Sequence, residues 1–189
     1  MVTKILLIVD PQNDFITGSL AVKDAKEKMM DLSEYIHENG INYNWICVTL
    51  DSHPKDHCSF KENGGSWPRH CVLYSNGWHD PEYLDESLGG LPVIYYHKGT
   101  ESDKEEYSIF DNTEDGQILL NHISELIDKG GVSIDICGIA GDYCVLETLK
   151  GLLQFVSPRY VKVLTQYTAS IDGGEKLMNF IKENNLNYE

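Results

Sequence analysis

Apolar residues form five short, nearly continuous runs along the chain, at residues 4–9, 43–50, 92–98, 132–140 and 160–165. The runs are rich in Val, Ile and Tyr, which favour strands, and they show little of the alternation expected of a strand with one wet face. Strands that are apolar on both sides are typical of parallel sheets, in which helices cover both faces. The pattern therefore predicts five buried parallel strands.

Segments with helical periodicity lie between or after these runs, at residues 24–40, 115–130, 142–155 and 173–185. Gly40 and Gly130 stand where two of these helices are expected to end. Alternating strands and helices predict an α/β fold with a doubly wound, mainly parallel sheet in three α/β/α layers. With 189 residues and 41% hydrophobic content, the chain is expected to form one domain, residues 1–189.

One connection interrupts this alternation. Residues 51–91 are rich in Gly, Pro, His and Trp and show little periodicity. A connection of this length inside a domain is usually either functional or disordered. The clusters "SWPRHC", "NGWHDP" and "PEYL" combine aromatic residues with proline, which argues against disorder. We therefore expect residues 51–91 to be a functional insertion.

Charge and cysteine usage exclude several classes of protein. The formal net charge is −15, and without a Lys/Arg cluster this argues against a nucleic-acid partner. No segment reaches the roughly 20 apolar residues of a membrane span, and the first apolar run is too short for a signal peptide. Five cysteines, an odd number with Cys47 and Cys137 inside predicted strands, indicate a reduced, cytoplasmic protein.

The first four predicted strands each end near a chemically reactive side chain. In chain order these side chains are Asp10, the pair Asp51 and His53, Lys98 and Cys144. In doubly wound sheets, ligands bind outside the carboxyl ends of the strands, near the point where the strand order reverses. We therefore expect these side chains to meet in one site.

Cys144 is the candidate nucleophile. If Asp142 is the N-cap of the following helix, Cys144 lies in its first turn, where unpaired N–H groups and the helix dipole lower the pKa of a thiol. The Cys144 amide, with that of Ala140, could also hold an oxyanion. The small residues Gly138, Ala140 and Gly141 would let a substrate approach the backbone. The alternative is that Cys144 only fills the core, because free cysteine is among the most buried residue types.

Asp10 and Lys98 each have two interpretations. Asp10 either ends a strand before the turn at Pro11 or acts as the general base that takes the thiol proton. Lys98 is either a surface lysine or a partly desolvated ammonium behind a buried apolar run. In the second case it would hold both Asp10 and Cys144 in their charged forms.

The long connection contains a candidate metal site. Asp51 and His53 are two residues apart, so in an extended segment both side chains point the same way. With His70 they offer one carboxylate and two imidazoles, which suits Zn²⁺, Fe²⁺ or Mn²⁺, and Glu62 or His57 could add a ligand. Acidic turns and exposed histidines would give the same spacing without a metal.

These features together resemble the isochorismatase-like cysteine hydrolases, and within them the nicotinamidase/pyrazinamidase group. The similar segments span nearly the whole chain: "LLIVDPQNDFITGSLAV", "LDSHPKDHCSF", "WPRHCV", "HKGT" with "EYSIF", and "DICGIAGDYCV". The resemblance implies a catalytic triad of Asp10, Lys98 and Cys144. It also implies an oxyanion hole made by the amides of Ala140 and Cys144, with a cis peptide bond before Ala140.

The resemblance further implies one divalent metal ion, zinc ahead of Fe²⁺ or Mn²⁺, and a pocket for an aromatic ring. The implied metal ligands are Asp51, His53, Glu62 and His70. The residues implied to line the ring pocket are Phe15, Trp67 and Tyr107. The segment 99–106 is longer than usual in the family, which leaves the role of Tyr107 open, and Ser52 stands where an aromatic residue is common.

The activity implied by the resemblance is hydrolysis of nicotinamide to nicotinate and ammonia through a thioester on Cys144, in the salvage of NAD. A cytoplasmic homo-oligomer that binds neither nucleic acid nor membranes is implied with it. The alternative enzyme is a related cysteine amidohydrolase that acts on another small amide, such as an N-carbamoyl or ureido compound. A non-catalytic α/β binding domain would leave the four reactive strand ends unexplained.

Overall fold

Six parallel strands form one sheet in the part of the chain that the computed structural model describes, residues 2–111 and 113–189. The sheet has the order β3-β2-β1-β4-β5-β6, and every neighbouring pair is parallel. The strands are β1 (Thr3–Val9), β2 (Trp45–Asp51), β3 (Val93–Lys98), β4 (Val132–Ile139), β5 (Val161–Ala169) and β6 (Asn187–Tyr188). The five predicted strands are confirmed, and β6 adds a short edge.

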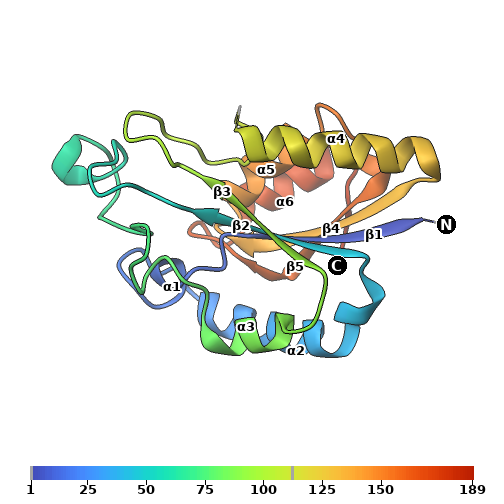
Figure 1. Cartoon of the computed structure of the whole chain (residues 1–189), viewed down its shortest axis with the longest axis horizontal. Helices are drawn as coiled ribbons and strands as arrows, with labels where there is room; N and C mark the ends of the chain where they lie inside the picture. The colour runs from blue at the N-terminus through green and yellow to red at the C-terminus, as the bar shows by residue number, and fades with distance from the viewer. Residues whose placement is uncertain (1, 112) are drawn as a thin grey trace.

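Helices cover both faces of the sheet, which confirms the predicted three-layer α/β fold (Figure 1). One face carries α1 (Asn13–Ile16), α2 (Ala25–Asn39) and α3 (Glu82–Leu88); the other carries α4 (Glu114–Lys129), α5 (Cys144–Leu152) and α6 (Glu175–Glu183). Single 3₁₀ turns lie at η1 (Gly40–Asn42), η2 (Lys61–Asn63) and η3 (Pro158–Tyr160). The sequence analysis did not predict α1 and α3, which are too short to show a clear period. Among the described residues, no helix combines the length and the apolar character that crossing a bilayer requires.

The central strand β1 explains why the apolar runs are continuous. Ile5 and Leu7 pack into the core beneath α4, α5 and α6, whereas Leu6 and Ile8 pack into the core beneath α2 and α3. All four side chains are buried, and burying such a side chain contributes roughly 1.5–3 kcal/mol. From Ile5 to Val9, β1 is therefore apolar on both faces.

The edge strand β3 departs from this pattern. Its apolar run was expected to be buried, but Ile94 and Tyr95 are 37% and 41% exposed because only β2 flanks the strand. Lys98 at the end of the same strand is nevertheless 1% exposed. Its burial therefore comes from the residues around the strand end and not from the strand itself.

The sheet order reverses between β1 and β4, and the loops at the carboxyl ends of the strands gather there with the long connection from β2 to α3 (Figure 1). Gly138 permits the close approach of these two strands. Its φ is 127°, and a Cβ atom there would lie 2.0 Å from the Val9 carbonyl oxygen. Gly138 therefore serves the packing of β4 against β1, and not the approach of a substrate as the sequence suggested.

Candidate active site

The side chains of Asp10, Lys98 and Cys144 meet at the carboxyl end of the sheet. Lys98 Nζ lies 2.8 Å from Asp10 Oδ2 and 3.7 Å from Cys144 Sγ. The side chains of Asp10 and Lys98 have no exposed surface, and Cys144 is 6% exposed. The structure thus brings together the three residues that the sequence singled out, and Lys98 is not a surface lysine.

Asp10 is held in place by the neighbouring strand. Thr49 Oγ1 donates a hydrogen bond of 2.7 Å to Asp10 Oδ1, and the Asp10 amide donates to the Thr49 carbonyl at 3.0 Å. The φ of Asp10 is 47°, a left-handed conformation that is uncommon for residues other than glycine and concentrates at functional sites. These contacts leave Asp10 Oδ2 directed toward Lys98.

The three groups strongly influence one another's protonation. Burial raises the pKa of Asp10 to about 6, although Lys98 acts in the opposite direction. Burial also raises the pKa of the Cys144 thiol well above its ordinary value; Lys98 opposes this rise, and the carboxylates of Asp10 and Asp51 add to it. The expectation that the helix start lowers the Cys144 pKa is therefore wrong. A raised pKa favours the neutral thiol, and a neutral thiol needs a base before it can attack.

The turn before α5 differs from the expected cap. Cys144 is the first residue of α5, as predicted, but the N-cap is Tyr143 and not Asp142. The Asp142 carboxylate instead accepts hydrogen bonds from the amides of Ile171 at 2.8 Å and Asp172 at 3.2 Å. Asp142 therefore ties the loop after β5 to the start of α5. The first N–H groups of a helix have no acceptor within it, so the Cys144 amide keeps its capacity to bind an oxyanion.

Asp51, His53 and His70 form a buried cluster beside the triad. Their ligand atoms lie within 4.8 Å of one another, and Asp51 Oδ2 is 3.5 Å from His53 Nε2 and 3.9 Å from His70 Nε2. Nδ1 of His53 lies 2.9 Å from the Gly99 carbonyl and Nδ1 of His70 lies 2.8 Å from the Pro68 carbonyl. A histidine that donates from Nδ1 presents the lone pair of Nε2, as metal ligands do.

These residues fit a divalent metal ion. The buried His53 Nε2 has no hydrogen-bond partner among the described residues, although unpaired buried nitrogen is costly. A set of one carboxylate and two imidazoles matches the ligands that zinc and similar ions take in proteins. Asp51 also connects this cluster to the triad, because its Oδ1 forms an ion pair with Lys98.

The structure does not bring the two further candidate ligands into the cluster. Glu62 has a side chain that is 49% exposed and forms an ion pair with Arg69. His57 stacks on His53, but its Nδ1 accepts from Ser59 Oγ at 2.7 Å and its Nε2 donates to the Lys104 carbonyl at 2.8 Å. Both nitrogens of His57 are thus occupied, and burial lowers its pKa to about 4. Of the candidate ligands, the described part of the chain therefore clusters Asp51, His53 and His70 but not Glu62 or His57.

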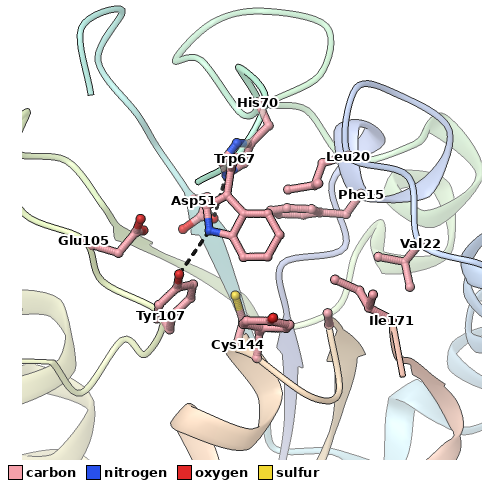
Figure 2. A pocket seen from close by; sticks show the side chains of 12 residues that line it. Phe15, Leu20, Val22, Asp51, Trp67, His70, Glu105, Tyr107, Cys144 and Ile171 are labelled. Carbon is pink, nitrogen blue, oxygen red and sulfur yellow. Dashed lines mark hydrogen bonds and ion pairs between the residues drawn. The ribbon is translucent and has the colours of Figure 1, made fainter. Parts of the chain in front are cut away.

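A pocket of about 390 Å³, including its open mouth, leads from the surface to Cys144. Figure 2 shows the Cys144 sulfur at its base, with Phe15 and Trp67 above and Tyr107 to one side. Trp67 Nε1 donates a hydrogen bond of 3.0 Å to the Tyr107 hydroxyl, which fixes the two rings relative to each other. All three predicted ring-pocket residues therefore line the pocket, despite the long segment before Tyr107.

Comparison with known proteins decides the family. The nicotinamidase/pyrazinamidase of Mycobacterium tuberculosis is 34% identical over 171 residues, which cover 88% of this chain and 86% of that protein. The chain belongs to the nicotinamidase/pyrazinamidase family. This confirms the resemblance seen in the sequence, although a scan against family models gave no match.

Two solved structures support membership of the nicotinamidase/pyrazinamidase family. The zinc complex of a pyrazinamidase from Pyrococcus horikoshii has a TM-score of 0.78 and 31% identity, covering 98% of each chain. The nicotinate complex of PnC1 from L. infantum has a TM-score of 0.84 and 27% identity, covering all of this chain and 92% of that one. The likeness extends over the whole chain, including the long connection.

The peptide bond between Ile139 and Ala140 is cis, as the resemblance to the nicotinamidase/pyrazinamidase family implied. Ala140 lies in the wall of the pocket beside Cys144. The amides of Tyr143 and Val145 both donate to the Ala140 carbonyl at 3.1 Å. These two hydrogen bonds hold the turn that joins β4 to α5.

The sequence analysis missed several residues that line the pocket: Leu20, Val22, Glu105, Tyr143 and Ile171. Tyr143 directly precedes Cys144, so its place beside the site was predictable from the sequence. Ile171 follows β5, and extending the survey of strand ends to the fifth strand would have found it. Leu20 and Val22 carry no chemical signal of their own, because only the folded loop brings them to the pocket.

Proposed function

We propose that this chain is a nicotinamidase, which hydrolyses nicotinamide to nicotinate and ammonia. The observation that carries the proposal is the meeting of Asp10, Lys98 and Cys144 at the base of an aromatic pocket, beside a cluster of metal-ligand type. Family membership supports the same reaction. A nucleophile, a base and an apolar pocket lined by aromatic side chains are the parts that hydrolysis of an aromatic amide requires.

The reaction begins with transfer of the Cys144 thiol proton to Asp10. A carboxylate with a pKa of about 6 is a suitable base at neutral pH, and the thiol needs one because its own pKa is raised. The sulfur then bonds to the carboxamide carbon of the substrate. The amides of Ala140 and Cys144 stabilise the negative oxygen of the tetrahedral intermediate, and Lys98 keeps the buried carboxylate oriented.

Collapse of the intermediate breaks the bond between carbon and nitrogen. Asp10 returns its proton to the departing nitrogen, which leaves as ammonia, and a thioester remains on Cys144. Water then attacks the thioester, with Asp10 again accepting a proton. The bond between carbon and sulfur then breaks, and Asp10 passes this proton to the sulfur. The carboxylic acid that forms loses its proton to ammonia, so the products are nicotinate, ammonium and the regenerated thiol.

The proposed metal ligands are Asp51, His53 and His70, and the proposed ion is zinc. A divalent ion held by these residues would act as a Lewis acid toward a pyridine nitrogen and would help to orient the ring. The zinc complex of the Pyrococcus horikoshii relative supports the choice of metal. Phe15 and Trp67 provide aromatic walls against which a flat ring packs.

We further propose that residues 1–189 act as one hydrolase domain, with residues 51–91 as its metal-binding insertion. The five free cysteines support a reducing compartment such as the cytoplasm. The homo-oligomeric state stays a prediction, which the exposed apolar residues Ile94 and Tyr95 on the edge strand support. Sedimentation velocity would measure the state directly.

Ammonia release from nicotinamide tests the proposed function. The wild-type protein should release ammonia, and Cys144→Ala should lower the rate at least a hundredfold, because the nucleophile is lost. Cys58→Ala is the matched control, since Cys58 is a free cysteine outside the pocket. Release from an N-carbamoyl compound but not from nicotinamide would replace the proposal with the alternative amidohydrolase. Residual activity of Cys144→Ala above a tenth of wild type would contradict the nucleophile.

A further inference from the structure

Gln12 is a completely buried polar residue to which the reaction above gives no part. It lies two residues after Asp10, just before α1. Burying an amide side chain is costly unless its donors and acceptor find partners. The partners of Gln12 therefore indicate what the residue is there to do.

The Gln12 side chain takes the place of a strand backbone. Regular pairing of β1 with β2 ends at Val9 and Thr49, two residues before Asp51, and Pro11 has no N–H to continue it. Instead, Gln12 Oε1 accepts a hydrogen bond of 2.9 Å from the Asp51 amide, and Gln12 Nε2 donates one of 2.8 Å to the Asp51 carbonyl. Both backbone groups of Asp51 are thereby satisfied by one side chain.

The same amide group also contacts the long connection near its end, shortly before α3. Gln12 Nε2 donates a second hydrogen bond of 2.8 Å to the carbonyl of Trp78. The indole of Trp78 in turn donates to Ser52 Oγ at 2.8 Å, between the two residues Asp51 and His53. Gln12 therefore holds the segment 51–53 in two ways. It bonds directly to the Asp51 backbone, and through Trp78 it is connected to Ser52.

We propose that Gln12 is a positioning residue, which sets the metal-binding carboxylate of Asp51 and joins it to the chain segment that carries Asp10. The inference rests on the proposed function and its metal centre. The Gln12 amide combines in one planar group an acceptor for the Asp51 N–H and donors for the carbonyls of Asp51 and Trp78. An ionised glutamate has the same length but no donor, and methionine has a similar volume but neither a donor nor a comparable acceptor.

The affinity for Zn²⁺, measured by competition with a chromophoric chelator, tests this role without reference to activity. Gln12→Met should bind Zn²⁺ roughly 10- to 100-fold more weakly than wild type, the range found when groups that orient metal ligands are removed. Gln12→Glu should also bind it more weakly, because its carboxylate faces the carbonyls of Asp51 and Trp78. If Gln12→Met does not fold, Gln12→Glu provides the measurement.

Tyr43→Phe is the matched control. Tyr43 is 6% exposed, and its hydroxyl donates to Asp135 at 2.7 Å near the amino-terminal end of β2, away from the site. This variant loses a buried hydrogen bond and is expected to keep its Zn²⁺ affinity within about twofold. Activity at saturating Zn²⁺ should recover substantially in Gln12→Met, because the nucleophile and base remain.

Gln12→Met with wild-type Zn²⁺ affinity would overturn the inference, and so would a Tyr43→Phe variant weakened to the same extent. These failures differ from a failure of the proposed function. A wild-type protein that binds no Zn²⁺, or releases no ammonia from nicotinamide, would overturn the proposed function and this inference with it. If the wild-type protein binds Zn²⁺ and releases ammonia, and Gln12→Met binds Zn²⁺ equally well, only the inference about Gln12 is overturned.

Discussion

Lys98 Nζ lies 2.8 Å from Asp10 Oδ2, and neither side chain has any exposed surface. The same ammonium forms an ion pair with Asp51, so one positive charge serves two buried carboxylates. Asp10 belongs to the nucleophile half of the site and Asp51 to the metal cluster. Lys98 is therefore the electrostatic connection between the two halves.

Replacing Lys98 with methionine should harm both stability and activity. Two carboxylates would be left buried without their cation, which costs about 3–5 kcal/mol in the free energy of unfolding. The rate of ammonia release should fall at least about a hundredfold, because Asp10 loses its orientation. Urea unfolding and ammonia release measure the two effects. Lys129→Met removes an exposed ion pair with Glu125 and should change neither; a Lys98→Met variant equally unaffected would refute the role.

Removing the metal should weaken the binding of nicotinamide at least about tenfold, because the pyridine nitrogen loses its partner. Calorimetry on the Cys144→Ala variant, with and without chelator, separates binding from turnover. Benzamide has the same shape without the ring nitrogen, so its affinity should not depend on the metal. Equal nicotinamide affinity in metal-free and metal-loaded protein would show that the ion does not orient the ring.

Glu105 should hasten the release of the anionic product. It lines the pocket, and a carboxylate there repels nicotinate but not neutral nicotinamide. Glu105→Gln should therefore strengthen inhibition by nicotinate about 3- to 10-fold and leave KM for nicotinamide nearly unchanged, with the difference shrinking in high salt. Glu101→Gln, in the same segment but outside the pocket lining, is the control. Unchanged inhibition in Glu105→Gln would rule out this role.

Asp80 should make stability depend on pH. It is 8% exposed, and among the described residues its Oδ1 has no hydrogen-bond partner. Burial, followed by the nearby Asp85, raises its pKa well above the ordinary value. A raised carboxyl pKa means that the folded state binds the proton more tightly, so stability is lost as pH rises from about 4 through the folded-state pKa.

Asp80→Asn removes this dependence. As the pH rises from 4 to neutral, the free energy of unfolding of the variant should increase by about 1–3 kcal/mol relative to that of wild type, because the variant has no charge to bury at residue 80. Urea unfolding across that range measures the gain. Asp128→Asn, on the exposed face of α4, is the control and should run parallel to wild type. Parallel curves for Asp80→Asn would contradict the prediction.

The sequence predicted the strand ends well, because the buried parts of the strands are mostly apolar and charged side chains follow them. Asp10 and Lys98 were recognisable for that reason. Because the carboxyl ends of parallel strands lie at the same edge of a sheet, both residues were expected there. The protonation of Cys144 was not predictable in the same way. It depends on complete burial and on the carboxylates of Asp10 and Asp51, which only the folded chain places beside the thiol.

Residues on irregular segments were harder to assign. Glu62 and His57 have ligand chemistry and suitable spacing, but their side chains are taken up by Arg69 and by local hydrogen bonds. Gln12 stood in a recognised segment, yet an amide side chain that replaces strand pairing leaves no pattern in the sequence. The spacing of residues in the sequence identifies candidate metal ligands. Ion pairs and hydrogen bonds in the folded chain decide which of these side chains are available to bind a metal.

Asp10 and Lys98 lie at the ends of strands and Cys144 begins α5, whereas Trp67 and Tyr107 come from two loops and their side chains share one hydrogen bond. Substitutions at Trp67 and Tyr107 are therefore the ones to try when the pocket is to accept bulkier aromatic amides. Such changes would leave Asp10, Lys98 and Cys144 in place.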